Sequence, residues 1–324
     1  MIPYFTLPTW TLGGIPLDPW GLLVCGGFVL GLEIARARGI KLGLDVRDIV
    51  DASVFIVLSG FLGGHLVYVL AYHPDRFEKD GIMSLVRVWE GFASTGGFLG
   101  AVTGAVLFFR VFRKRPFWLH GDAIMFGFPF AWIFGRAGCF VVHDHIGRHT
   151  SFPLAVDFSR VRLPVKEELV ATLARTDLLD GQRWGRDPDG DPWVLGGVRH
   201  DLGLYETLVA VGIAGLFLVL ARKPRAAGFF TMVWCLTYAP ARFSMDFLRA
   251  SDLRGADVRW AGFTPAQWVM LAMFAAGCVL WTRIKGAPVV SLLGDDGAEG
   301  GPPPSATPPP EAAANNVASD ATAD

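Results

Sequence analysis

Residues 203–221 read GLYETLVAVGIAGLFLVLA and decide the class of fold, because Glu206 is the only charged residue among them. A transmembrane helix needs about 20 mostly apolar residues to cross the hydrocarbon core of a bilayer. Six other stretches of the chain have a similar length and composition. The seven stretches cover residues 20–37, 48–72, 94–112, 121–141, 203–221, 227–247 and 263–283. The sequence therefore predicts an all-α polytopic membrane protein with seven transmembrane helices.

The composition of the whole chain supports a membrane protein. Hydrophobic residues make up 52% of the 324 residues and charged residues only 18%, whereas soluble domains average about 25% charged residues. This excludes disorder of the whole chain and an ordinary cytosolic enzyme. The four cysteines are scattered without CxxC spacing, which disfavours a disulfide framework or a zinc site built from them. No basic run is long enough to indicate nucleic-acid binding, and we expect no cofactor.

Arginine and lysine predict the orientation, because short cytoplasmic loops carry an excess of these residues. Short segments on one side of the predicted membrane hold 13 of them, and those on the other side hold seven. The 13 lie within residues 36–47, 110–115, 222–225 and 283–285, and the seven within residues 76–87 and 242–259. The segment from 136 to 203 is left out of this comparison, because long loops translocate regardless of charge. We expect the N-terminus outside and the C-terminus in the cytoplasm.

Five segments follow from these spans. They are a periplasmic N-terminal segment (1–19), transmembrane helices one to four (20–141), a periplasmic loop or small head region (142–202), transmembrane helices five to seven (203–285), and a disordered, acidic, Pro- and Ala-rich cytoplasmic tail (286–324). Within the head region, residues 187–192 are typical of a turn-rich loop, and Lys166–Arg175 is predicted as a short amphipathic helix.

Polar clusters lie where the predicted spans meet the outer side. Arg136 lies near the end of the fourth span and Glu206 near the start of the fifth. Arg242, Asp246 and Arg249 are spaced i, i+4 and i+7, so they share one helix face. Arginine suits phosphate, because its planar fork donates two hydrogen bonds to one group. We therefore expect a site for an anionic head group, the alternative being snorkelling arginines and structural ion pairs.

The same residues resemble the prolipoprotein diacylglyceryl transferase family. Its signature, approximately G-R-x-G-N-F-x-N-x-E-x-x-G, is represented by Gly135, Arg136, Gly138, Cys139, Phe140, Val142, Asp144 and Gly147. Its H-x-x-x-L-Y-E motif is matched by His200, Leu204, Tyr205 and Glu206. Its R-F-x-x-E-F-x-R-x-x-D motif is matched by Arg242, Phe243, Asp246, Phe247, Arg249 and Asp252. Weaker matches, such as Gly262-Phe263-Thr264-Pro265-Ala266-Gln267-Trp268, extend the resemblance over roughly residues 15–285.

The chain departs from the family pattern at several positions. The H-G-G of the third span is Thr95-Gly96-Gly97 here, so the histidine is missing. The other departures are Cys139 and Val142 for two asparagines, Asp144 and Asp246 for two glutamates, and His65 for an arginine. Asp144 and Asp246 keep the negative charge of the family's glutamates, but their side chains are one methylene shorter.

The resemblance implies transfer of the diacylglyceryl group of phosphatidylglycerol to the thiol of a lipobox cysteine in a prolipoprotein signal peptide. Glycerol phosphate is released at the outer leaflet of the bacterial inner membrane. The nucleophile belongs to the substrate, so the enzyme needs cations for the phosphate and a base for the thiol. Arg136 and Arg242 suit the first role. For the second, the candidates that replace the missing histidine are His143, His145, His200 and Asp144.

These considerations give one set of candidate residues. The predicted catalytic residues are Arg136, His143, Asp144, Arg242 and Asp246. The predicted substrate-binding residues are His65, Tyr68, Thr95, Gly96, Gly97, Gly147, His200, Tyr205, Glu206 and Arg249. Core packing is the alternative for His65 and Tyr68, and close helix–helix approach is the alternative for Gly96.

Other chemistries are disfavoured. The run His143-Asp144-His145 with His149 suggests zinc, but no helical H-E-x-x-H spacing exists, and we expect hydrogen-bonded histidines and no metal. Cys139 is expected to be a small filler in place of asparagine rather than a nucleophile. A lipid- or signal-peptide-binding homologue without turnover is the alternative function, and the missing histidine would be its hallmark. A small transporter is disfavoured, because the sequence has no internal repeat and its polar residues cluster at one leaflet.

Overall fold

The computed structural model describes residues 1–88, 91–168, 184–254, 256–257 and 259–290. Six helical stretches are long and apolar enough to cross a membrane, which agrees with a polytopic helical membrane protein. They are α1 (Pro19–Lys41), α2 (Val46–Val67) with the π-helical turn Tyr68–Tyr72, α5 (Ser94–Val106) with the π-helical turn Leu107–Phe112, α6 (Phe117–Val142), α8 (Leu202–Leu220) and α10 (Pro265–Ile284). The seventh predicted span corresponds to α9 (Phe229–Met245), whose 17 residues make it shorter than these six.

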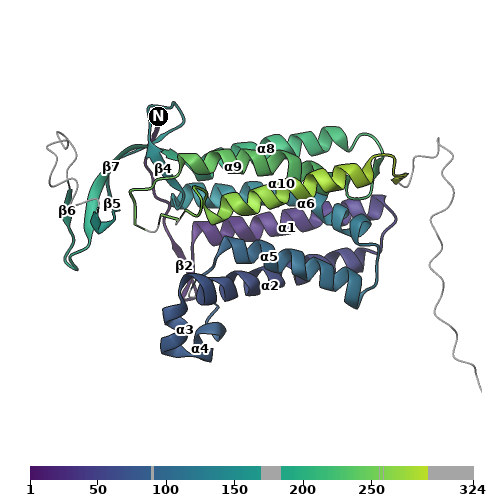
Figure 1. The fold of residues 1–324 in the computed structure, drawn as a ribbon, viewed down its shortest axis with the longest axis horizontal. Coiled ribbons are helices and arrows are strands. Elements are labelled where there is room, and N and C mark those ends of the chain that lie inside the picture. Colours follow the sequence, from purple (N-terminus) through teal and green to yellow (C-terminus); the bar gives the residue numbers. More distant parts are fainter. Residues whose placement is uncertain (89–90, 169–183, 255, 258, 291–324) are drawn as a thin grey trace, which may run out of the picture.

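The helices pack in pairs. α1 lies against α6, α2 against α5, α6 against α8, and α9 against α10 (Figure 1). Small residues allow the closest approach: a Cβ atom added to Gly96 of α5 would lie 2.3 Å from the carbonyl oxygen of Gly63 in α2. The large buried aromatic residues gather instead between α6, α8 and α9, around Phe126, Phe217 and Trp234. The expected role of glycine in helix packing is therefore observed at Gly96.

Local signals fix where several helices begin. Asp18, Asp45 and Asp201 each accept a hydrogen bond from a backbone N–H of the first turn of α1, α2 and α8, respectively. α10 begins with a capping box in which Thr264 and Gln267 satisfy each other's backbone N–H groups. These caps matter for the site described below, because α8 and α10 both begin beside it.

The head region contains a sheet rather than only turns. Its strands are β4 (Ile146–His149), β5 (Val156–Pro164), β6 (Trp184–Arg186) and β7 (Pro192–Asp201), joined by β1 (Ile2–Pro3) from the N-terminus. The order is β1-β5-β7-β4, with β6 also paired to β7 and all pairs antiparallel except β1 with β5. Residues 187–191 form the turn between β6 and β7. Most of the predicted helix Lys166–Arg175 lies outside the described residues, as does the predicted tail from residue 291.

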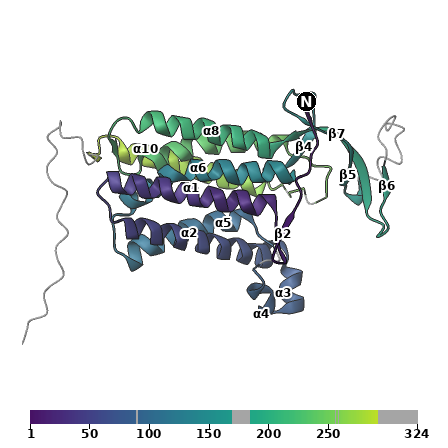
Figure 2. The ribbon, with the colours of Figure 1, turned by 180° about the vertical axis from the view of Figure 1, so that it is seen from behind.

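The two ends of the helices differ in what they carry. The sheet and the short helices α3 (Pro74–Asp80) and α4 (Ile82–Val86) extend from one end (Figure 1, and from behind in Figure 2). The connections 42–45, 113–116 and 221–228 lie at the other end, where α10 also finishes. The segments predicted to be outside therefore lie at one end, and the Arg- and Lys-rich connections lie at the other.

The orientation of this bundle in the membrane can be tested with fusions. A reporter active only in the cytoplasm is expected to be active when fused after Gly294 and silent when inserted at Asp189, because Arg and Lys are retained on the cytoplasmic side. Cells expressing each fusion at equal level give the comparison. Activity at Asp189 together with silence at Gly294 would reverse the orientation.

Candidate functional site

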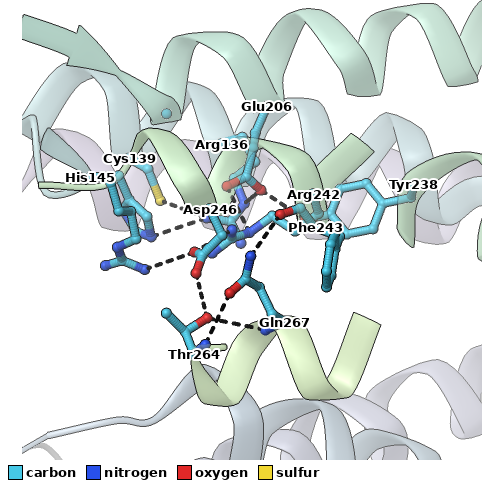
Figure 3. Close-up of polar contacts among 12 residues, drawn as sticks. Arg136, Cys139, His145, Glu206, Tyr238, Arg242, Phe243, Asp246, Thr264 and Gln267 are labelled. Carbon is cyan, nitrogen blue, oxygen red and sulfur yellow. Dashed lines mark hydrogen bonds and ion pairs between the residues drawn. The ribbon is translucent and has the colours of Figure 1, made fainter. Parts of the chain in front are cut away.

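Two buried arginines meet on one buried carboxylate at the sheet end of the helices. Arg136 comes from the last turns of α6, Arg242 from the last turn of α9, and Glu206 from the first turns of α8. The Nε atoms of Arg136 and Arg242 lie 3.0 and 3.1 Å from the two carboxylate oxygens of Glu206. Glu206 has no solvent exposure. Figure 3 shows the two guanidinium groups converging on this carboxylate from different helices.

Tyr238 completes the surroundings of Glu206. Its hydroxyl donates a 2.8 Å hydrogen bond to Glu206 Oε2. Tyr238 lies one helical turn before Arg242 on α9, so both side chains reach Glu206 from one helix face. A buried charge is tolerated only when it is paired and hydrogen-bonded, and Glu206 meets both conditions. Glu206 alone does not neutralise the two guanidinium groups, and a second negative charge beside Arg242 comes from Asp246.

A second acid ties Arg242 to the start of α10. Asp246 accepts a 2.8 Å hydrogen bond from Nη1 of Arg242 and a hydrogen bond from the hydroxyl of Thr264. Nη1 of Arg249 lies 3.9 Å from Asp246 and 3.2 Å from Asp257. Asp246 is fully buried, whereas about a quarter of the Arg249 side chain is exposed. Arg249 is therefore at the rim of the cluster and Asp246 in its interior.

His145 and Asp144 border the cluster on the loop that follows α6. The Nε2 atom of His145 lies 3.4 Å from Nη1 of Arg136, and its Nδ1 atom is hydrogen-bonded to the Asp144 carboxylate. The Sγ atom of Cys139 is 3.9 Å from the same Nη1 atom. Cys139, Asp144 and His145 could hold a metal by distance alone. However, the Arg136 guanidinium faces both Cys139 and His145, and its positive charge opposes a cation there.

The structure places His143 elsewhere. Its Nδ1 and Nε2 atoms are 2.7 Å from an Asp201 carboxylate oxygen and 3.2 Å from the Phe5 carbonyl oxygen. Rings of the N-terminal segment, α6 and β5 surround it. His143 also has a left-handed backbone, with φ +50°, at the end of α6. Both ring nitrogens are thus engaged away from Arg136, in contacts that join the N-terminus to the start of α8.

His200, Tyr205 and Gly147 lie together beside the cluster. His200 Nδ1 is 2.9 Å from the Tyr205 hydroxyl, and burial lowers the pKa of His200. Gly147 forms a β-bridge with Arg249, and an added Cβ atom there would be 2.6 Å from both the Leu248 carbonyl oxygen and the His200 Cβ atom. Glycine at this position therefore allows the strand β4 to approach the segment that carries Arg249.

The predicted residues of α2 and α5 divide into two groups. His65 is fully buried, and its nitrogens lie 3.0 and 2.9 Å from the carbonyl oxygens of Gly91 and Ser84, while Tyr68 packs against Gly91. These two side chains hold the segment with α3 and α4 against α2. A Cβ atom added to Gly97 would be 2.6 Å from the ring of Phe92, so this glycine accommodates the same segment.

Thr95 lies in the first turn of α5. Its hydroxyl is 3.3 Å from the Tyr72 hydroxyl. Phe98, one turn later on the same face, contacts the ring of Trp132 at a centroid distance of 5.6 Å. The Arg136 guanidinium in turn lies 4.6 Å from the Trp132 ring. Within the described part of the chain, Thr95 is hydrogen-bonded to Tyr72 and to neither arginine, and the contact between α5 and the arginine cluster runs through Phe98 and Trp132.

Several residues of the site were not among the predicted ones. Tyr238, four residues before Arg242, was not named, and Thr264 and Gln267 appeared only in the weaker motif at 262–268, whereas His145 had been named as one of four possible bases. The Gln267 amide donates a 3.2 Å hydrogen bond to the Phe243 carbonyl oxygen, which joins α10 to α9. The helical spacing could have indicated Tyr238, whereas the contacts of Gln267 depend on tertiary structure.

Comparison with known proteins identifies the family. The profile of the prolipoprotein diacylglyceryl transferase family matches residues 8–283. A phosphatidylglycerol–prolipoprotein diacylglyceryl transferase of Burkholderia cenocepacia (strain HI2424) is 33% identical over 287 residues, which cover 83% of this chain and 91% of that protein. The protein of the same name from Burkholderia thailandensis is 32% identical over 297 residues, which cover 85% of this chain and 94% of that protein. The chain therefore belongs to the prolipoprotein diacylglyceryl transferase family, a family of membrane transferases.

Proposed function

We propose that this protein transfers the diacylglyceryl group of phosphatidylglycerol to the cysteine thiol of a prolipoprotein lipobox. The reaction takes place at the outer leaflet of the bacterial inner membrane, and the lipobox belongs to a signal peptide. The observation that carries this proposal is the pair of buried arginines, Arg136 and Arg242, held by Glu206 at one end of the helices. Family membership and the relatives' names support the same substrates.

The arginine pair suits the leaving group of this reaction. When the bond between the diacylglyceryl carbon and the phosphate oxygen breaks, negative charge grows on glycerol phosphate. A guanidinium has five N–H donors, and Glu206 is approached by Nε of each arginine. Asp246 accepts from Nη1 of Arg242 and His145 faces Nη1 of Arg136, so the remaining terminal N–H groups of the two arginines are the ones available to a phosphate oxygen. Because Glu206 already fixes their orientation, little reorganisation is needed as the charge develops.

The position of the cluster suits a lipid head group. Arg136 and Arg242 lie near the ends of α6 and α9, and Glu206 lies near the start of α8. The outward faces of the long helices carry exposed apolar side chains, including Val29, Leu58 and Leu99. Acyl chains can therefore contact these faces while a phosphate at the helix ends reaches the arginines.

A second candidate function is binding of lipid or signal peptide without turnover. The observation that favours it is Thr95, because a hydroxyl at this position cannot act as a base near neutral pH whereas an imidazole can. Lipid binding is expected under both functions, so only a measurement of transfer separates them.

The transfer reaction itself is the first test. The protein in membrane vesicles that contain phosphatidylglycerol is expected to add one diacylglyceryl group to a lipobox peptide with cysteine, and none to the same peptide with serine, because the nucleophile is a thiolate. Mass spectrometry of the peptide measures the product. Absence of product, in vesicles where the Burkholderia cenocepacia relative gives product, would reject transfer and leave the binding function.

The arginines give the second test. Arg136→Lys and Arg242→Lys are each expected to lower the transfer rate roughly 10-fold to over 100-fold, because a lost charge-assisted hydrogen bond costs about 1.5–3 kcal/mol. Lysine keeps the charge but not the planar fork. The matched control is Arg254→Lys, since Arg254 is exposed and pairs with Asp191 in the sheet region. Thermal unfolding in detergent checks that each variant folds. If both arginine variants fold and transfer at the wild-type rate, Arg136 and Arg242 do not bind the phosphate and serve only as structural ion pairs.

A further inference from the structure

The proposed function needs a base, and the family histidine of the third span is absent. A lipobox thiol with an ordinary pKa of about 8.5 is mostly protonated at pH 7. Resting on the proposed function, we propose that His145 accepts this proton through Nε2, and that Asp144 is the residue that positions it. His145 occupies a variable position of the family signature, so the pattern of the family does not assign it this role.

The contacts of His145 fit a general base. Asp144 holds Nδ1, which orients the ring and makes Nε2 the nitrogen that can accept a proton. Nε2 accepts a 3.4 Å hydrogen bond from Nη1 of Arg136, which the lipobox thiol has to replace, and the Asp144 carboxylate offsets the charge of Arg136 when the ring takes up the proton. The side chain of His145 is 19% exposed, so the ring is held but can still be reached by a substrate. The His145 carbonyl oxygen also accepts a 3.0 Å hydrogen bond from the Leu202 backbone, which fixes the loop against the start of α8.

The position of His145 next to Arg136 matches the geometry of the reaction. In the displacement, the attacking sulfur and the leaving phosphate oxygen are bonded in turn to the same carbon. The sulfur and the phosphate oxygen lie on opposite sides of that carbon in the transition state, so the base and the cations need to border the same small site rather than contact each other. Figure 3 shows His145 beside Cys139 at the border of the arginine cluster, with Nε2 directed toward Arg136.

The other histidines lack this combination. All seven lie in the described part of the chain, and His145 alone among them has a ring nitrogen within hydrogen-bond distance of Arg136. His143 is engaged by Asp201 and Phe5, and both ring nitrogens of His65 are engaged by backbone carbonyl oxygens. His200 pairs with Tyr205. The proposed base therefore lies in the loop after α6, whereas the histidine of the family pattern would lie in α5.

The proposed step balances without any further reactant. His145 Nε2 takes the proton of the lipobox thiol. The thiolate sulfur forms a C–S bond with the glycerol carbon that carries the phosphate, and the C–O bond breaks with its electron pair left on glycerol phosphate. The proton on His145 then passes to the released phosphate or to water. Arg136 and Arg242 stabilise the charge on the departing group.

The test compares His145→Gln with wild type at two pH values. Glutamine keeps a polar side chain but cannot act as a base. At pH 7 we expect the transfer rate to fall about 10²–10⁴-fold, the usual contribution of a positioned base. At pH 9 the ratio of the wild-type rate to the His145→Gln rate is expected to be more than about tenfold smaller than at pH 7. The reason is that the thiolate fraction of a free thiol rises about 25-fold between these pH values. If His145→Gln were slow only because its fold is damaged, its rate relative to wild type would be the same at both pH values, since a larger thiolate fraction does not repair the fold.

Two further variants sharpen this comparison. Asp144→Asn is expected to lower the transfer rate at pH 7 less than His145→Gln does, because the ring of His145 remains but loses its orientation. Its rate is likewise expected to approach the wild-type rate at pH 9. The groups that face His145 from other elements are Arg136 and Cys139 of α6 and Glu206 of α8, and neither variant changes them. The matched control is His149→Gln, an exposed histidine four residues along the same segment, which is expected to keep the wild-type rate.

The outcomes separate the failure of this proposal from failure of the proposed function. If wild type transfers and His145→Gln transfers equally well at pH 7, or its deficit is the same at pH 9, His145 is not the base. Thr95→His in the otherwise wild-type chain is expected to change the rate less than about threefold, because a base is already present. A gain of roughly a hundredfold or more would also overturn the role of His145. No transfer by wild type would reject the proposed function and this proposal with it.

Discussion

The buried carboxylate of Glu206 is the constraint on which the rest of the site depends. A fully buried carboxylate is costly unless cations and hydrogen bonds surround it. Arg136, Arg242 and Tyr238 supply those contacts from α6 and α9, while Glu206 itself comes from α8. The requirement to pair this one charge therefore fixes the ends of three helices relative to one another. It also prevents the two guanidinium groups from spreading apart, which their mutual repulsion would favour.

Contacts spread from this centre to the other elements. Asp246 joins Arg242 to Thr264, which is also the cap of α10, and Trp132 joins Arg136 to Phe98 of α5. On the sheet side, Asp252 is held by Arg199 of β7 at 2.5 Å. Although burial alone would raise it, hydrogen bonding and the charge of Arg199 lower the pKa of Asp252. The segment after α9 is thus fixed to the bundle at Asp246 and to the sheet at Asp252.

The sequence predicted the helices well because apolar length is a local property. The predicted span 121–141 and the observed Phe117–Val142 differ by a few residues, and the difference is a first turn that contains Trp118 and His120. The sheet was missed for a physical reason. The strand β7 contains Gly196, Gly197, Arg199 and His200, residues typical of loops, and its pairing with β5 is a tertiary contact. The 17-residue α9 includes Pro240 and two polar side chains of the site, Tyr238 and Arg242, which weaken its apolar signal.

The candidate site was predictable in part. Arg136, Glu206, Arg242 and Asp246 are far apart in the sequence, and their motifs predicted a shared site that the structure brings together. The catalytic roles of Arg136, Arg242 and Asp246 and the substrate-binding role of Glu206 stay predictions. The choice between His143 and His145 could not be made from the sequence. The left-handed backbone at His143 turns the chain after α6, so residues two apart face different surroundings: Asp201 and the N-terminus for one, Arg136 for the other.

The most direct measurement of the central claim is a double-mutant cycle between Glu206→Gln and Arg242→Gln on the free energy of unfolding in detergent. Each single change removes one partner of a buried charge, although Arg242 keeps Asp246 and Glu206 keeps Arg136, and breaking a buried pair costs up to about 3–5 kcal/mol. Because the two groups act on each other, the double variant is expected to be clearly less destabilised than the sum of the single variants, by more than about 1 kcal/mol. Additive effects would contradict the account, since Glu206 would then not be the group that holds the arginines in place.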